Sequence, residues 1–131
     1  MNINMEKTKA YYTTQADACL CDCEVCQLYQ NRVRTQFPNI AQWLEEHGID
    51  STKPYEAIWF EEESGNIFYP EVQYIVFGSC EEDFSCRVDD AELTVAKSTP
   101  KLPGITDPYF VLCVNCLDIM PDKPIPPKAK K

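Results

Sequence analysis

The sequence predicts an α+β fold in which two N-terminal helices pack on one face of a roughly five-stranded, mainly antiparallel sheet. Between residues 22 and 47 the apolar side chains recur every three or four positions, as on one face of a helix. From residue 55 onward they alternate with polar residues or form short continuous runs, as in strands. Turns and short loops join these runs, and nothing in their order indicates the strand–helix–strand units of a parallel sheet.

The chain has 131 residues, the size of one domain. We expect a lead segment over residues 1–18, a single domain over 19–120 and a proline- and lysine-rich tail over 121–131. The lead segment lacks the apolar run of a signal peptide, and no later stretch is long enough to span a bilayer. These features predict a cytoplasmic protein that does not enter membranes.

The first helix is predicted to begin at Asp22, whose carboxylate can cap it, and to end at Phe37. Its apolar stripe comprises Val25, Leu28, Tyr29, Val33 and Phe37. Pro38 ends this helix because the residue before a proline is disfavoured in the helical region. A second helix is predicted to follow, with Asn39 as its cap and Gly48 at its end.

The remaining elements are predicted as strands. The run Glu63-Ser64-Gly65-Asn66 is a turn sequence, so the segments on either side of it should form a hairpin. The last segment is apolar on both faces, as in a central strand. The predicted strands are residues 55–60, 67–69, 72–77, 91–97 and 109–117.

The charge is strongly negative and unevenly distributed. The formal net charge is −9, but residues 122–131 hold four basic residues and one acidic residue, so the remainder carries −12. Such a surface repels phosphate backbones and anionic lipids and attracts basic proteins. We therefore expect no nucleic acid and no membrane among its ligands. A basic protein partner is one interpretation, and acidity that only keeps the protein soluble is the other.

Four of the eight cysteines lie between Cys19 and Cys26, where the first helix is predicted to begin. Cytosolic thiols stay reduced, which favours metal ligation or plain burial over disulfides. A CxxC motif at a helix start brings two thiolates to one centre, and the positive end of the helix lowers their pKa. Cys21, Cys23 and Cys26 are therefore the predicted ligands of a structural zinc ion. Candidates for the fourth ligand are Cys19, Cys80, Cys86, Cys113 and Cys116.

Two other interpretations of the thiols stay open. They could pack as small buried hydrophobic side chains, or Cys23 and Cys26 could act as a redox pair. Cys113 and Cys116 fall within a predicted strand, where their odd separation places them on opposite faces. Cys80 and Cys86 flank an acidic loop, which a disulfide or a metal would close if the strand ends meet.

Catalytic motifs are missing from the sequence. His47 is the only histidine, and its place in the last turn of a predicted helix is explained by the helix dipole. The four glycines are isolated, so none forms a phosphate-binding loop. The acidic clusters do not match a calcium-binding loop.

Several short motifs occur along the first two thirds of the chain: Asp22-Cys23-x-x-Cys26, Phe37-Pro38, Trp43-Leu44, His47-Gly48-Ile49-Asp50, Lys53-Pro54 and Tyr74-Ile75-Val76-Phe77-Gly78. Together they resemble a family of small, uncharacterised bacterial cytosolic proteins. In that family a cysteine-rich first helix precedes a Gly-Ile-Asp turn and an antiparallel sheet. The resemblance covers roughly residues 19–79. It implies α+β order and a bacterial origin, but no activity.

The sequence thus favours a non-enzymatic acidic binding protein that engages a basic partner, as bacterial toxin-neutralising (immunity-like) proteins do. A zinc ion bound by the cysteines would hold the first helix in place. The alternative is a thiol-redox enzyme or sensor that uses Cys23 and Cys26.

Overall fold

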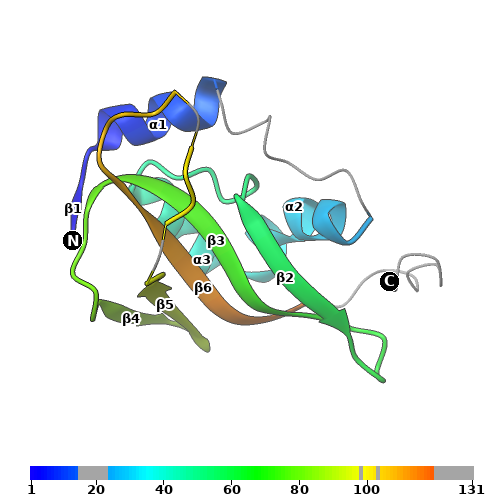
Figure 1. The fold of residues 1–131 in the computed structure, drawn as a ribbon. Coiled ribbons are helices and arrows are strands. Elements are labelled where there is room, and N and C mark those ends of the chain that lie inside the picture. Colours follow the sequence, from blue (N-terminus) through cyan, green and yellow to red (C-terminus); the bar gives the residue numbers. More distant parts are fainter. Residues whose placement is uncertain (15–23, 98, 103, 120–131) are drawn as a thin grey trace.

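The protein has an α+β fold in which three described helices pack against a curled antiparallel sheet (Figure 1). The computed structural model describes residues 1–14, 24–97, 99–102 and 104–119. Its elements are β1 (Asn2–Ile3), α1 (Met5–Thr14), α2 (Glu24–Gln36), α3 (Pro38–Glu46), β2 (Glu56–Glu61), β3 (Ile67–Ser79), β4 (Ser85–Val88), β5 (Ala91–Val95) and β6 (Tyr109–Ile119). Within these residues, no helix is both long and apolar enough to cross a membrane.

β3 and β6 form the centre of the sheet. They pair in one continuous register from Ile67 opposite Ile119 to Phe77 opposite Tyr109. β5 and then β4 continue the sheet beyond β6. The other edge of β3 pairs with two strands. The first half of β3 pairs with β2, and its last residues, Gly78 and Ser79, pair with β1. The predicted strands 67–69 and 72–77 are thus a single strand.

A bulge at Pro70 explains why that strand was predicted in two pieces. Ile58 pairs with Glu71 and Phe60 with Phe68, so two residues of β3 lie opposite one residue of β2. Proline has no backbone N–H to give to a sheet and is tolerated at such a bulge. The bulge increases the local twist, and the pattern of buried positions along β3 shifts across it.

Helices α2 and α3 follow the predicted pattern closely. Tyr29 and Val33 of α2 are fully buried, and Leu28 and Phe37 pack against the same core. α3 begins at Pro38, and Phe37 occupies the cap position without a side-chain bond, so the predicted Asn39 cap is wrong. Proline suits the first position of a helix because the N–H it lacks would have no helical partner there. The predicted Asp22 cap lies outside the described residues.

Helix α1 was not predicted and completes the edge of β3. Between the stretches that pair with β1 and β2, the Thr8 Oγ1 accepts a hydrogen bond from the Phe77 N–H at 3.1 Å. Tyr12 donates its hydroxyl to the Ile75 carbonyl at 2.8 Å. Thr8 is completely buried. Side chains of a helix therefore replace the missing strand, because buried backbone groups must find partners. The prediction of only two helices was incomplete for this reason.

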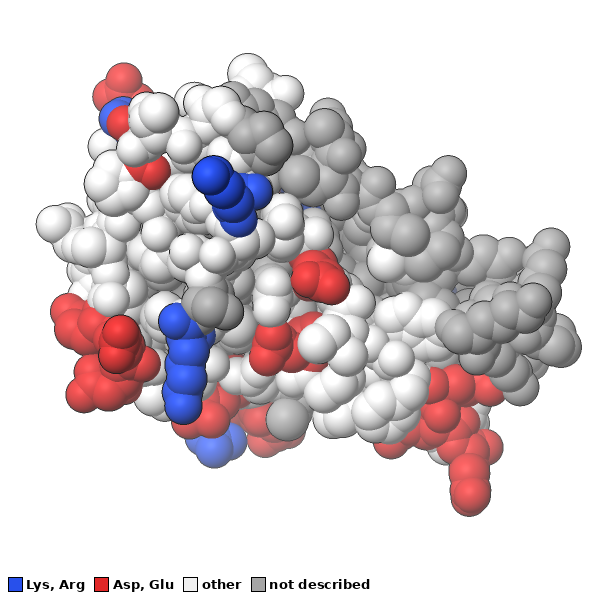
Figure 2. All heavy atoms as spheres, in the orientation of Figure 1, with Lys and Arg blue, Asp and Glu red and all other residues white. Residues whose placement is uncertain are grey.

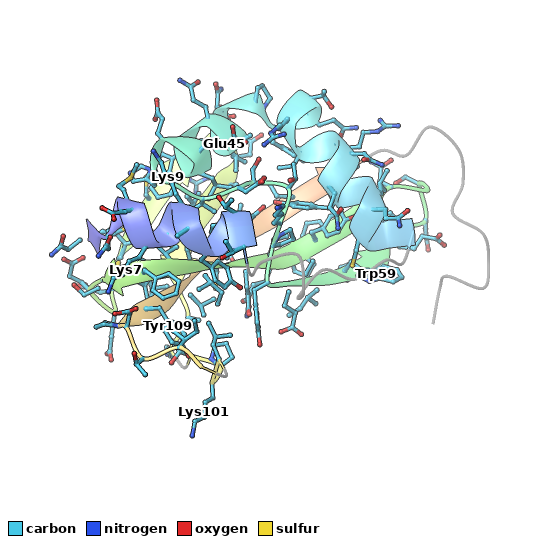
Figure 3. The ribbon with its side chains drawn as sticks, turned by 90° about the horizontal axis from the view of Figure 1, so that it is seen from above. Lys7, Lys9, Glu45, Trp59, Lys101 and Tyr109 are labelled. Carbon is cyan, nitrogen blue, oxygen red and sulfur yellow. The ribbon has the colours of Figure 1, made fainter. Side chains whose placement is uncertain are left out.

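The two faces of the sheet are covered by different elements. α2 and α3 lie on one side, whereas the loop before β6, which carries Lys101, lies on the other (Figure 3). Tyr109 anchors that loop, since the Leu102 N–H donates to its hydroxyl at 3.2 Å and the hydroxyl contacts the Pro100 carbonyl. We call the side away from α2 and α3 the outer face.

Candidate functional site

The predicted metal ligands are only partly described. Cys19, Cys21 and Cys23 lie outside the described residues, and Cys26 is the third residue of α2. The described part of α2 begins at Glu24, and the predicted start at Asp22 lies outside the described residues. In the part of the chain that the structure describes, no three histidine, cysteine or acidic side chains are close enough to hold a metal ion. The zinc site remains a prediction.

The other described cysteines are dispersed over the sheet. Cys80, Cys86 and Cys113 are free thiols, and Cys86 and Cys113 belong to β4 and β6. Cys86 of β4 lies opposite the buried Leu93, on the side that packs against the core. Cys113 of β6 lies between Gln73 and Thr94, whose side chains share the outer face. Because Cys86 and Cys113 lie on opposite faces, they cannot bind one metal ion.

Burial makes two of these thiols hard to ionise. Cys113 is 3% exposed, and burial, with a smaller effect of the Glu71 charge, raises its pKa to about 12. Burial also raises the pKa of Cys80, beside Glu81. Metals and electrophiles react with thiolates, so the raised pKa disfavours ligation and nucleophilic attack by Cys113. Cys113 fits the interpretation as a buried hydrophobic side chain, whereas Cys80 is only partly buried.

The His47-Gly48-Ile49-Asp50 motif forms a turn that ties the helices together. Gly48 has a φ of +84°, and a Cβ there would lie 3.3 Å from the Met5 carbonyl oxygen of α1. His47 stacks on Trp43, and its Nδ1 lies 2.6 Å from the Trp43 carbonyl oxygen. The single histidine thus has a structural position, as predicted.

A polar groove of about 510 Å³ lies beside this turn. Arg34 bridges Glu45 at 2.8 Å and Asp50 at 3.4 Å across it. Lys53 donates to the Tyr12 carbonyl at 3.0 Å. The charges therefore join α1, α2 and α3, and we interpret the groove as a structural junction rather than a ligand site.

The outer face of the sheet carries a different arrangement of charge. Paired residues of an antiparallel sheet point to the same side, so the register defines two rows across five strands. One row is Ile58, Glu71, Asn115, Glu92 and Arg87; the other is Glu56, Gln73, Cys113, Thr94 and Ser85. We call these ten residues the outer platform. It contains three carboxylates and one basic side chain.

The segment of the sequence that forms β2 and β3 is acidic and contains no basic residue. Between Lys53 and Arg87 there are eight acidic residues and no lysine or arginine. This segment includes β2, β3 and the turn between them. Acidic side chains lie over the middle of the outer face, at the β2–β3 turn and near the β3–β4 loop (Figure 2). The described ion pairs of Arg34 and Lys7 involve carboxylates outside β2 and β3.

Negative charge is concentrated just after the end of β2, where Glu62 lies near Asp118 of β6. A hydrogen bond with Asp118 of β6, together with the charge of that carboxylate, raises the pKa of Glu62. A neighbouring like charge disfavours the ionised form of a carboxyl group. A nearby positive charge would relieve this crowding.

Two large apolar side chains are exposed in the same strand. Ile58 is 49% exposed and Phe60 is 51% exposed, and Phe60 packs edge-on against Phe68 with ring centroids 5.2 Å apart. Both alternate with the inward-facing Ala57 and Trp59. The combination of apolar side chains with a charged surround is typical of a protein-binding surface.

Comparisons with known proteins found no matching family model, no matching curated protein and no matching solved structure. The sequence prediction found the acidity but not the outer platform. The lack of basic residues between Lys53 and Arg87 was the available signal.

Proposed function

We propose that this protein is a non-enzymatic binding protein whose outer platform and β2 engage a basic protein partner, in the manner of immunity-like proteins. The observation that carries the proposal is the acidic segment between Lys53 and Arg87, folded so that Ile58 and Phe60 are exposed among its carboxylates. Apolar side chains supply affinity at such a surface, while the surrounding charge steers the partner and selects its sign.

The location of the basic residues supports the same conclusion. Among the described strands, Arg87 is the only lysine or arginine. The other basic residues of the described chain lie in α1, α2 and the loops. β2 and the β2–β3 turn carry the carboxylates of Glu56, Glu61, Glu62 and Glu63 and no basic residue, so this end of the sheet accelerates association with a basic protein at low salt.

Salt-dependent capture tests the proposal. The immobilised full chain should retain a basic protein from a lysate of its source at low ionic strength and lose it at about 0.3 M salt, where charges are screened beyond a few ångströms. The captured protein would be identified, purified and titrated against the full chain. Recovery of no partner, or of one with no salt dependence, would argue against the proposal.

Matched variants localise the binding. Glu56→Gln with Glu71→Gln removes two outer-face charges and should weaken binding about 2- to 30-fold, from roughly 0.2–1 kcal/mol per exposed charge. Glu6→Gln with Glu46→Gln removes two charges from α1 and α3 and should leave affinity nearly unchanged. Equal effects of both pairs would show that only net charge matters.

The start of α2 supports a second proposal, a zinc ion held by Cys21, Cys23 and Cys26. The described part of this motif places Cys26 in the first turn of a helix, where the helix dipole favours a thiolate. Elemental analysis of protein purified without a metal-affinity step should find one zinc per chain. If it finds none, thiol titration decides whether Cys23 and Cys26 form the alternative redox pair, which requires at least one pKa below the usual thiol value of about 8.5.

A further inference from the structure

Among the described strands, β2 is an edge strand with one unpaired side. It pairs with β3 along one side, and none of the described strands pairs with its other side. Such an edge presents a row of backbone donors and acceptors that another strand can use. The usual obstacles, a proline or a lysine, are missing from its sequence Glu-Ala-Ile-Trp-Phe-Glu.

The opposite edge of the sheet is less suitable. β4 has four residues against six in β2, and Arg87 lies in the middle of it. Asp89, directly after β4, has a φ of +55°, which ends the extended conformation. The two exposed apolar side chains of the sheet, Ile58 and Phe60, belong to β2. β2 is therefore the better edge for an added strand.

The charge around β2 selects the occupant. Glu56 and Glu61 are at its two ends, and Glu62 and Glu63 follow directly. A second copy of this chain would bring the same carboxylates together, and like charges across a strand pair are destabilising. A basic segment would instead place a cation near each carboxylate. Charge complementarity thus favours a basic partner over self-association.

We infer that the free edge of β2 accepts an extended basic segment of the partner as an added strand. The inference rests on the proposed function and specifies how the partner binds. Main-chain hydrogen bonds between β2 and the segment would supply affinity whatever the sequence of the segment. Every second side chain of the segment would contact the protein and supply specificity. The segment would place lysine or arginine near Glu56 and Glu61 and apolar residues near Ile58 and Phe60.

A pair of peptides tests this mode of binding. The probe is the capped peptide Lys-Lys-Val-Thr-Val-Thr-Lys, and its control has proline in place of the second valine. Both carry the same charge, but proline removes a backbone donor and disfavours a paired strand. We expect the valine peptide to bind about tenfold more tightly to the full chain, the effect of losing one or two net hydrogen bonds.

Hydrogen exchange separates strand pairing from simple charge attraction, because charge attraction alone does not protect the backbone amides of β2. Bound valine peptide should slow amide exchange in residues 56–61, whereas the proline peptide should not. Equal affinity of both peptides, without slower exchange, would overturn strand addition and leave the acidic binding surface in place. No binding of either peptide would also overturn it, while the proposed function would still be decided by the salt-dependent capture.

Two variants and a shortened chain complete the test. Ile58→Lys puts a positive charge on the edge and should weaken the valine peptide about tenfold, whereas Met5→Lys on α1 should not. Both side chains are partly exposed, so both variants should fold. If a chain that lacks residues 122–131 binds the peptide about tenfold more tightly, the chain's own basic tail occupies the edge and the inference is wrong.

Discussion

Removing the hydroxyl group of Tyr29 or of Tyr74 should have very different costs, because their hydrogen bonds form a chain with one direction. Both side chains are completely buried. The Tyr74 hydroxyl donates to the Ser51 carbonyl at 2.7 Å, which uses its only proton. Tyr29 must therefore be the donor in the 2.5 Å contact between the two hydroxyl groups. Tyr29 ends the chain, whereas Tyr74 is its middle member.

The magnitudes follow from what each change leaves behind. Tyr29→Phe removes one bond and leaves Tyr74 still bonded to Ser51, so the expected loss of unfolding free energy is about 0.5–1.5 kcal/mol. Tyr74→Phe leaves two buried groups without partners, the Ser51 carbonyl and the Tyr29 hydroxyl. At about 1–3 kcal/mol for each group, the expected loss is about 2–6 kcal/mol. The total free energy of unfolding of a domain of this size is roughly 5–15 kcal/mol.

Urea denaturation, followed by circular dichroism at neutral pH, measures both losses. Tyr55→Phe is the control, since this hydroxyl has no hydrogen bond among the described residues and the side chain is only partly buried. The three slopes of free energy against urea should agree, so that the midpoints report stability alone. If Tyr29→Phe costs as much as Tyr74→Phe, the direction assigned to the chain is wrong.

Three further outcomes are expected. Thr8→Val leaves the buried Phe77 N–H without its acceptor and should lower stability by about 1–3 kcal/mol, whereas Thr8→Ser keeps the hydroxyl and should cost less; equal losses in urea denaturation would contradict the role of α1 at the sheet edge. Burial raises the pKa of Tyr29 and of Tyr74, so above pH 10 the unfolded chain releases protons that the folded chain keeps. Stability present below pH 10 should therefore fall by about 1.4 kcal/mol per pH unit for each tyrosine, and more gently in Tyr29→Phe; urea midpoints that stay constant to pH 11.5 would refute this. Finally, alkylation at pH 8 followed by mass spectrometry should find Cys113 at least about tenfold slower than the other described thiols, because it is buried and its pKa is raised to about 12; equal rates would contradict its burial.

The sequence predicted the elements whose pattern is local. The apolar stripe with Tyr29 and Val33 identified α2, and the turn around Gly65 identified the β2–β3 hairpin. It divided β3 at Pro70 because proline ordinarily interrupts a strand, and only the pairing with β2 shows the bulge that tolerates it. It missed β4, which has four residues, too few for a clear alternation.

Helix α1 shows a different kind of failure. Its sequence Met-Glu-Lys-Thr-Lys-Ala-Tyr-Tyr-Thr-Thr has no apolar stripe of the usual helical spacing. Its stability comes from contacts distant in sequence, the bonds of Thr8 to Phe77 and of Tyr12 to Ile75. Tertiary packing commonly decides whether such a segment is helical.

Composition alone establishes the acidity of this protein and the absence of basic residues between Lys53 and Arg87. Strand pairing places Glu56, Glu71 and Glu92 on one face, exposes Ile58 and Phe60 beside them, and puts Cys86 and Cys113 on opposite faces of the sheet. No sequence pattern predicts these placements, because composition and periodicity are properties of neighbouring residues. Strand register joins residues far apart in the chain, and a shift of one position would turn every side chain to the other face.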